Sequence, residues 1–109
     1  MEAQLIDLNK YKTPNSKVFT GRDNGRKIRE ESGIDVLEIS ATRIKVLIPA
    51  GIYSINPSFF EEFFFNVVRR LGRDKFLEKF EIVSEGRLKY DTILIEAVNR
   101  ILRTKTALG

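Results

Sequence analysis

Three arginines in the first third of the chain are spaced as one face of a helix. Arg22, Arg26 and Arg29 follow an i, i+4, i+7 pattern, and a stripe of guanidinium groups can hold a phosphate or an acidic protein surface. A solvated helix face is the competing interpretation, because Asp23 and Lys27 are opposite charges four residues apart. Both interpretations stay open at the level of the sequence.

A second basic cluster follows the most aromatic segment of the chain. The candidate anion-binding residues are therefore Arg22, Arg26, Arg29, Arg69, Arg70, Arg73 and Lys75. Counting Lys and Arg against Asp and Glu gives +2 over residues 1–32, −2 over 33–68 and +4 over 69–109. The positive charge is thus divided around an acidic middle, and no helix-turn-helix, zinc-finger or aromatic–basic sheet motif accompanies it. Nucleic-acid or nucleotide binding is the alternative function rather than the first.

The residue types that most catalytic sites require are missing. The chain contains no His and no Cys, which excludes thiol chemistry, imidazole acid–base chemistry, disulfides and the usual zinc sites. Glu61 and Glu62 are adjacent, so on a helix they point about 100° apart and do not form a facing carboxylate pair. We therefore expect no enzymatic activity, no catalytic residues, no metal site and no cofactor.

The length and composition indicate one α/β domain. A chain of 109 residues, 42% hydrophobic and 31% charged, has room for a single core. We expect an N-terminal strand and loop over residues 1–16, a first helix ending at Gly33, and a frayed tail over residues 104–109. The first helix has only Ile28 as a large apolar residue, so we expect it to be the least firmly held.

The strongest helix signal begins at Asn56. Asn is a good N-cap, Pro57 suits the first helical position, and Ser58 with Glu61 has capping-box spacing. The helix is expected to reach Leu71, with its phenylalanines and valines on one face and Glu61, Glu62 and Arg69 outside it. Phe65 lies almost opposite the apolar face, either as a surface aromatic covered by its neighbours or as an anchor for a partner.

Apolar segments on either side of this helix predict the sheet. Residues 4–8, 18–20, 43–50 and 80–83 are expected strands, and the run over 43–50 reads as its buried centre. Residues 34–39 fit either a strand or a helical turn, and 74–78 are expected to be a short turn. A last helix is expected from Asp91 to Arg103. Strands that alternate with helices favour an α/β fold with a partly parallel sheet.

The central part of the chain carries a motif: a strand, a turn ending in Ser-Phe, an acidic residue, an aromatic helix, Leu-Gly and a second strand. The residues of this motif, with an upstream Gly-Arg and a further Gly and Arg, are Gly21, Arg22, Gly25, Arg29, Ile44–Ile48, Ser58, Phe59, Glu62, Phe63, Phe64, Leu71, Gly72 and Phe80–Val83. With them, the stretch from Ile52 to Val83 resembles the STAS-like domain family of small bacterial and phage-encoded proteins, distant relatives of the anti-sigma factor antagonists. The resemblance extends over about residues 17–103.

The resemblance implies a fold and a mode of action. It implies a small mixed β-sheet of four or five strands with helices packed mainly on one side, and it implies protein binding rather than turnover. In the antagonists a serine at the start of the corresponding helix is phosphorylated by a kinase-like partner, which abolishes binding, and Ser58 lies in the matching place. As plain chemistry Ser58 is either such a phosphoacceptor or a helix cap.

These observations favour a non-enzymatic regulatory protein–protein interaction module that acts by partner switching. The expected contact residues are Arg22, Tyr53, Asn56, Ser58, Glu61, Glu62 and Phe65. The expected partner is another protein, with a histidine-kinase-like ATPase or a regulator as the class implied by the resemblance; a homo-oligomer is a further alternative. No apolar run approaches the roughly 18 residues that span a bilayer, and no signal peptide is evident, so a cytoplasmic location without membrane contact is expected.

Overall fold

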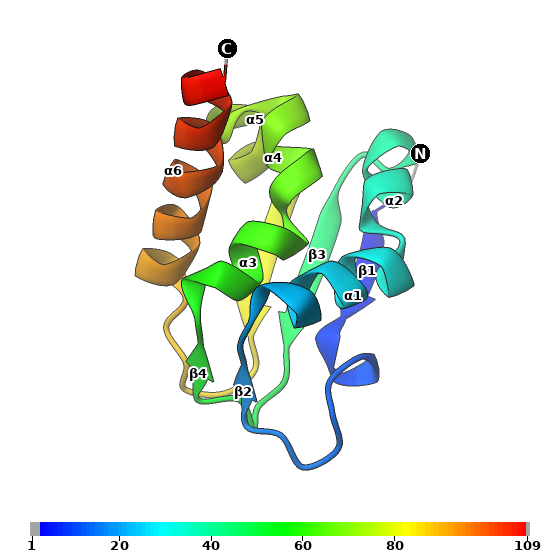
Figure 1. Ribbon diagram of the computed structural model, residues 1–109. Coiled ribbons are helices and arrows are strands. Elements are labelled where there is room, and N and C mark those ends of the chain that lie inside the picture. Colours follow the sequence, from blue (N-terminus) through cyan, green and yellow to red (C-terminus); the bar gives the residue numbers. More distant parts are fainter. Residues whose placement is uncertain (1–2, 109) are drawn as a thin grey trace.

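Three parallel strands form the larger sheet in a computed structural model that describes residues 3–108, with side chains described through Arg103 (Figure 1). The strand order is β1 (Gln4–Asp7), β3 (Ile44–Ile48) and β5 (Phe80–Ser84). A second, smaller sheet pairs β2 (Val18–Phe19) with β4 (Ser54–Ile55), also in parallel.

The α/β class is confirmed, and the sheet differs in detail from the expected one. Every strand pair in the described part of the chain is parallel, and the strands are divided between two sheets instead of sharing one mixed sheet. Long connections that contain helices explain the parallel pairing, since an antiparallel neighbour needs only a short hairpin.

The helices lie mainly on one side of the larger sheet, where Figure 1 shows α1, α3 and α4 in front of the strands and α6 at the left. The chain crosses from β1 to β3 and from β3 to β5 in the same direction across the sheet. Two right-handed crossovers in the same direction place their helices on the same face of the sheet. The helical elements are η1 (Leu8–Lys10), α1 (Arg22–Ser32), α2 (Ile34–Ser40), α3 (Pro57–Phe63), α4 (Phe65–Leu71), α5 (Arg73–Lys79) and α6 (Asp91–Leu108).

Side chains alternate strictly across the central strand. Ile44, Val46 and Ile48 are buried under the helices, whereas Lys45 is exposed on the opposite face. Val46 pairs in register with Ile6 and with Ile82, and all three are buried. The sheet therefore has one covered face, which holds the core, and one open face.

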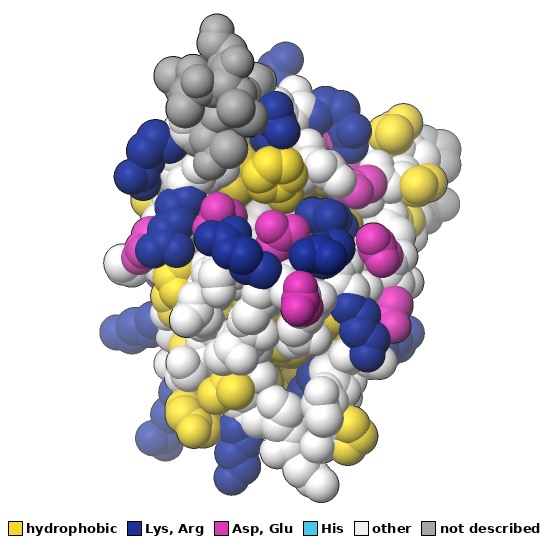
Figure 2. All heavy atoms as spheres, viewed as in Figure 1, with side chains coloured by type: hydrophobic (Ala, Val, Ile, Leu, Met, Phe, Trp, Pro, Cys, Tyr) yellow, Lys and Arg dark blue, Asp and Glu magenta, His cyan; other side chains and the backbone are white. Residues whose placement is uncertain are grey.

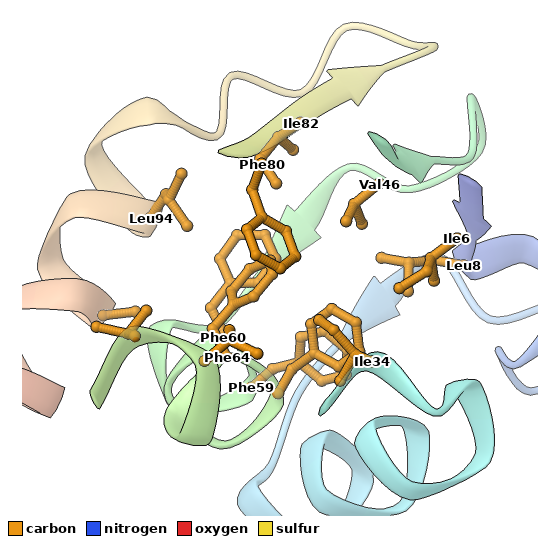
Figure 3. Packing of buried hydrophobic residues seen from close by; sticks show 14 of the residues in the cluster. Ile6, Leu8, Ile34, Val46, Phe59, Phe60, Phe64, Phe80, Ile82 and Leu94 are labelled. Atoms are coloured by element: carbon orange, nitrogen blue, oxygen red, sulfur yellow. The ribbon is translucent and has the colours of Figure 1, made fainter. Parts of the chain in front are cut away.

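Phenylalanine rings fill the space between the sheet and the helices. All eight phenylalanines except Phe65 are fully or almost fully buried. Phe64 occupies the centre, with its ring centroid 5.3 Å from Phe60, 4.8 Å from Phe63 and 5.0 Å from Phe76. Figure 3 shows Phe60 and Phe64 projecting from the helices toward Phe80 of the sheet.

The observed helices differ from the expected ones at four places. The helix expected over 57–71 is divided at Phe64, whose φ of −95° and ψ of 6° leave the helical range, and becomes α3 and α4. Residues 34–40 form α2, so the helical one of the two alternatives for residues 34–39 is the one observed. The turn expected over 74–78 is α5, because the buried Phe76 anchors it to the core. The last helix, expected from Asp91 to Arg103, is assigned as far as Leu108.

Candidate functional site

The turn from Tyr53 leads into α3, and Asn56 caps that helix as the sequence predicts. The Asn56 Oδ1 atom accepts hydrogen bonds from the Ser58 backbone N–H at 2.9 Å and from the Ser58 hydroxyl at 2.8 Å. Pro57 occupies the first helical position. Ser58 is therefore the second residue of the helix, so its interpretation as the cap, with a capping box to Glu61, is wrong.

Glu61 and Glu62 are turned into the molecule rather than toward a partner. Glu61 is only 7% exposed, with one carboxylate oxygen 3.2 Å from Arg22 Nη1 and the other 3.8 Å from Arg100 Nη1. Glu62 lies 3.5 Å from Arg29 Nη1, which also donates to the Glu62 backbone carbonyl at 2.6 Å. We call these five residues the charge network; it links α1, α3 and α6.

Gly25 explains why these carboxylates are covered. A Cβ atom on Gly25 would lie 2.6 Å from the Phe59 carbonyl oxygen and 2.9 Å from Glu62 Cβ, so α1 and α3 cross with their backbones almost in contact. Arg22 and Arg29 lie one turn to either side of the crossing and reach the carboxylates. The expectation that α1 is weakly held is therefore wrong. Gly25 lets the backbones of α1 and α3 pack directly against each other, so α1 does not need large apolar side chains to be held in place.

Phe65, the other expected contact on the central helix, is half-buried at the edge of the core. The Arg69 guanidinium carbon lies 5.2 Å from the centre of its ring, within the range of a cation–π contact. Of the two interpretations of Phe65, the structure favours the aromatic covered by neighbouring side chains.

Arg70, another candidate anion-binding residue, is paired with a second buried carboxylate, that of Glu38. Glu38, 4% exposed, receives Arg70 Nη2 at 2.6 Å and Nε at 2.7 Å, and Lys79 Nζ at 3.0 Å. Burial by itself raises the pKa of the Glu38 carboxyl, but hydrogen bonds and attraction from Lys79 and Arg70 outweigh it and hold that pKa below its ordinary value. The group ties α2 to α4 and α5.

The candidate anion-binding residues therefore do not form one surface. Arg22, Arg29 and Arg70 face buried or half-buried carboxylates, and Arg26 lies 3.2 Å from Asp23 on its own helix. Arg73 and Lys75 are exposed at the beginning of α5. Figure 2 shows the result as a band in which basic and acidic side chains alternate across the helices. Such a band offers a phosphate no concentrated positive charge.

The carboxyl ends of β3 and β5 meet at a surface recess of about 490 Å³. We call it the loop recess; it is lined by Ala50, Ile52, Tyr53, Gly86, Arg87 and Leu88. Tyr53 is 69% exposed at its rim, and Arg87 is exposed beside it. In open α/β sheets the crevice outside the carboxyl ends of the strands is the usual place for a ligand.

Backbone contacts hold the segments around the loop recess together. A Cβ atom on Gly86 would lie 2.3 Å from the Ala50 carbonyl oxygen, so only glycine permits this approach of the two loops. The Glu85 N–H donates to the Ile48 carbonyl at 2.9 Å, and the Tyr53 N–H donates to the Lys17 carbonyl at 2.9 Å. The recess thus joins three separate parts of the chain.

Sequence reasoning named Tyr53 as an expected contact and did not name other residues of the loop recess, such as Arg87 and Leu88. The available signal was the pair of glycine-containing loops that follow the two most apolar strands, at Gly51 and Gly86. Parallel strands bring such loops to the same edge of a sheet. The parallel order was expected only in part, so the two loops were not placed together.

Comparison with known proteins gives no relative that would assign a family: no family model, curated protein sequence or solved structure matches the chain. Among the described residues, no group of three or more Asp and Glu side chains is arranged to hold a metal ion. A search of the same residues finds no helix with the length and apolar character needed to cross a membrane.

Proposed function

We propose that the protein is a non-enzymatic module that binds another protein through the loop recess and the adjoining start of α3. The observation that carries this proposal is Tyr53, which is 69% exposed at the rim of the recess. Aromatic side chains dominate the energetics of protein interfaces, because they bury a large area while fixing few torsions. Asn56 and Ser58, also expected contacts, follow Tyr53 along the chain.

The charge around the loop recess favours an acidic partner segment. Arg87 lines the recess, and Lys17 is exposed and tied to Tyr53 by a backbone hydrogen bond. Positive charge at the rim of an interface speeds association with an acidic surface and excludes a basic one. The partner class remains the one that the family resemblance implies, a regulatory protein such as a histidine-kinase-like ATPase.

Phosphorylation of Ser58 is the proposed switch in this scheme. The Ser58 hydroxyl lies at the first turn of α3, 2.8 Å from Asn56 Oδ1. A phosphate there adds about −1.5 to −2 charges near neutral pH and removes the hydroxyl as a donor to Asn56. It also places negative charge beside a surface proposed to bind acidic residues, so we expect it to weaken the complex.

Nucleic-acid binding through the arginine clusters has less support. Arg22, Arg29 and Arg70 are engaged with carboxylates of the chain itself. Filter binding of single- and double-stranded DNA and RNA over a salt series decides this alternative, because real phosphate contacts give an affinity that falls steeply with salt. Absence of binding at low salt would remove it.

Photocrosslinking in cells tests the proposed surface directly. A photoreactive amino acid at position 53 is compared with the same group at position 77, since Leu77 is also an exposed hydrophobic residue but lies in α5. We expect one or a few proteins to crosslink at 53 and not at 77. The same set of proteins from both positions, or none from position 53, would contradict the proposal.

The identified partner then allows a quantitative test with purified proteins. We expect Tyr53→Ala and Arg87→Glu each to weaken binding at least tenfold, which is about 1.4 kcal/mol, with the melting temperature unchanged. Arg73→Glu on the exposed part of α5 is the matched control for charge. Ser58→Asp is expected to weaken binding, and Ser58→Ala is expected to preserve it. Wild-type affinity for Tyr53→Ala, Arg87→Glu and Ser58→Asp would reject the surface.

A further inference from the structure

The two edges of the larger sheet differ in how they are protected. At β5 the Tyr90 hydroxyl donates to the Ile82 carbonyl at 2.9 Å, so part of this edge is already hydrogen-bonded. Burial, with the charges of Asp91 and Glu81, raises the pKa of Tyr90, so the phenol stays protonated and continues to donate. At β1 no described strand pairs with the outer edge.

The backbone of β1 presents free hydrogen-bonding groups at that edge. The Gln4 N–H donates inward to the Arg43 carbonyl at 2.9 Å. Because successive residues of a strand alternate in the direction of their N–H and C=O groups, Leu5 and Asp7 direct theirs outward. An exposed edge of this kind is a template for another strand.

Large exposed apolar side chains occur on both β1 and α2. Among the described residues, the exposed large hydrophobics are Leu5, Val36, Ile39, Tyr53 and Leu77. Leu5 lies in β1, and Val36 and Ile39 lie in α2, which overlaps β1 in the view of Figure 1. On the open face, Leu5 also lines a recess of about 360 Å³ together with Ala3, Gln4, Lys45 and Leu47.

We propose that a second copy of this chain pairs with the free edge of β1, antiparallel, about a two-fold axis at Leu5. Leu5 then faces Leu5 of the other copy, and Asp7 faces Ala3, so the only charged residue of the strand meets no like charge. An axis perpendicular to the sheet keeps both α2 helices on one face of the joined sheet, where the exposed Val36 and Ile39 of each copy approach the other. The arrangement is isologous, as expected for a two-fold dimer.

The contact is small. One short strand and one face of a two-turn helix make a smaller interface than the roughly 800 Å² per partner of a standard one. We therefore expect a weak dimer that forms at high protein concentration. This proposal is independent of the loop recess, which lies at the other end of the strands from the start of β1.

Disulfide trapping tests the pairing in a chain that has no cysteine of its own. Leu5→Cys puts the single thiol on the two-fold axis, where the Cα separation of about 5.5 Å in a hydrogen-bonded antiparallel pair suits a disulfide. Leu77→Cys, also exposed, is the control. We expect rapid oxidation of Leu5→Cys to a covalent dimer and slow oxidation of Leu77→Cys. Equal rates for the two variants would overturn the proposal.

Sedimentation of the full chain gives a second, independent measurement. We expect the weight-average mass of the wild type to rise from 12.6 kDa toward twice that value as the concentration passes the dissociation constant. Leu5→Pro removes the outward N–H and the Leu5 side chain but no hydrogen bond of the ladder to β3, so it is expected to sediment as a monomer, as is Ile39→Lys. A wild type that stays monomeric at 1 mM, or a Leu5→Pro variant that dimerises as well as the wild type, would overturn the proposal.

Discussion

The helices and the loops at the strand ends use polar residues in opposite ways. In the helices, the buried Glu38 and Glu61 each meet arginine or lysine side chains from another element. In the loop recess, Tyr53 and Arg87 are exposed, and the contacts that hold the loops together come from the backbone. The charged residues with the most suggestive spacing thus stabilise the fold itself, so a binding surface is better sought where the backbone alone supports it.

The largest effect is expected from the centre of the helix packing. Phe64→Ala removes a ring in contact with Phe60, Phe63 and Phe76 and is expected to lower the free energy of unfolding by about 3–5 kcal/mol. Urea denaturation measures this change. Phe65→Ala, at a half-buried position, is the matched control and should lower the free energy of unfolding clearly less. An equal loss for the two variants would contradict a larger contribution of the Phe64 ring contacts to stability.

The close crossing of α1 and α3 predicts whether Gly25→Ala stabilises or destabilises the protein. In an unhindered helix interior, Gly→Ala stabilises by about 1 kcal/mol. At Gly25 the new methyl group meets the Phe59 carbonyl at 2.6 Å, so we expect Gly25→Ala to destabilise by about 1–3 kcal/mol. Gly51→Ala, where a Cβ meets nothing within 4 Å, is the control. Thermal unfolding that shows Gly25→Ala to be stabilising would mean that the crossing is looser than described.

An effect of similar size, but dependent on pH, is expected at Glu38. Glu38→Gln leaves Lys79 and the half-exposed Arg70 without their carboxylate and should cost about 1–3 kcal/mol at pH 7. The pKa of Glu38 is lowered in the folded state, so its stabilisation is complete above the ordinary pKa of 4.5 and is lost as the pH falls below it.

Unfolding of wild type and Glu38→Gln at several pH values checks this prediction. We expect the difference between them to be constant near neutrality and to shrink below about pH 4.5. Glu78→Gln, at an exposed position on α5, is the control and should change stability by less than about 0.5 kcal/mol at any pH. A difference that does not depend on pH would show that the charge of Glu38 contributes nothing.

Local signals predicted the parts of the fold that local chemistry determines. Gly33 ends α1 in the left-handed conformation, and Asn56 with Pro57 begins α3, as expected from their capping preferences. The division of the central helix at Phe64 and the helical state of α5 were not predicted. Phe64 and Phe76 meet ring to ring in the core with centroids 5.0 Å apart, and periodicity does not report such a contact between separate helices.

The candidate site shows the same division between local and distant information. Tyr53 was predicted from the family resemblance and the turn in which it lies. Glu61 was expected on an exposed face, because a helical wheel shows which residues share a side but not which element covers it. Gly25 and Gly86 decide two of the closest backbone approaches in the molecule, and a single sequence does not show what a glycine is close to.

The parallel strand order has a consequence for the growing chain. Every pairing joins distant residues: Gln4 with Ile44, Ile44 with Phe80, and Val18 with Ser54. During synthesis, β1 therefore has no partner until β3 has left the ribosome, and the second edge of β3 has no partner until β5 follows. Helical turns form within about a microsecond, so the amphipathic helices on the crossovers are the first structure available to shield these strands while the sheet is incomplete.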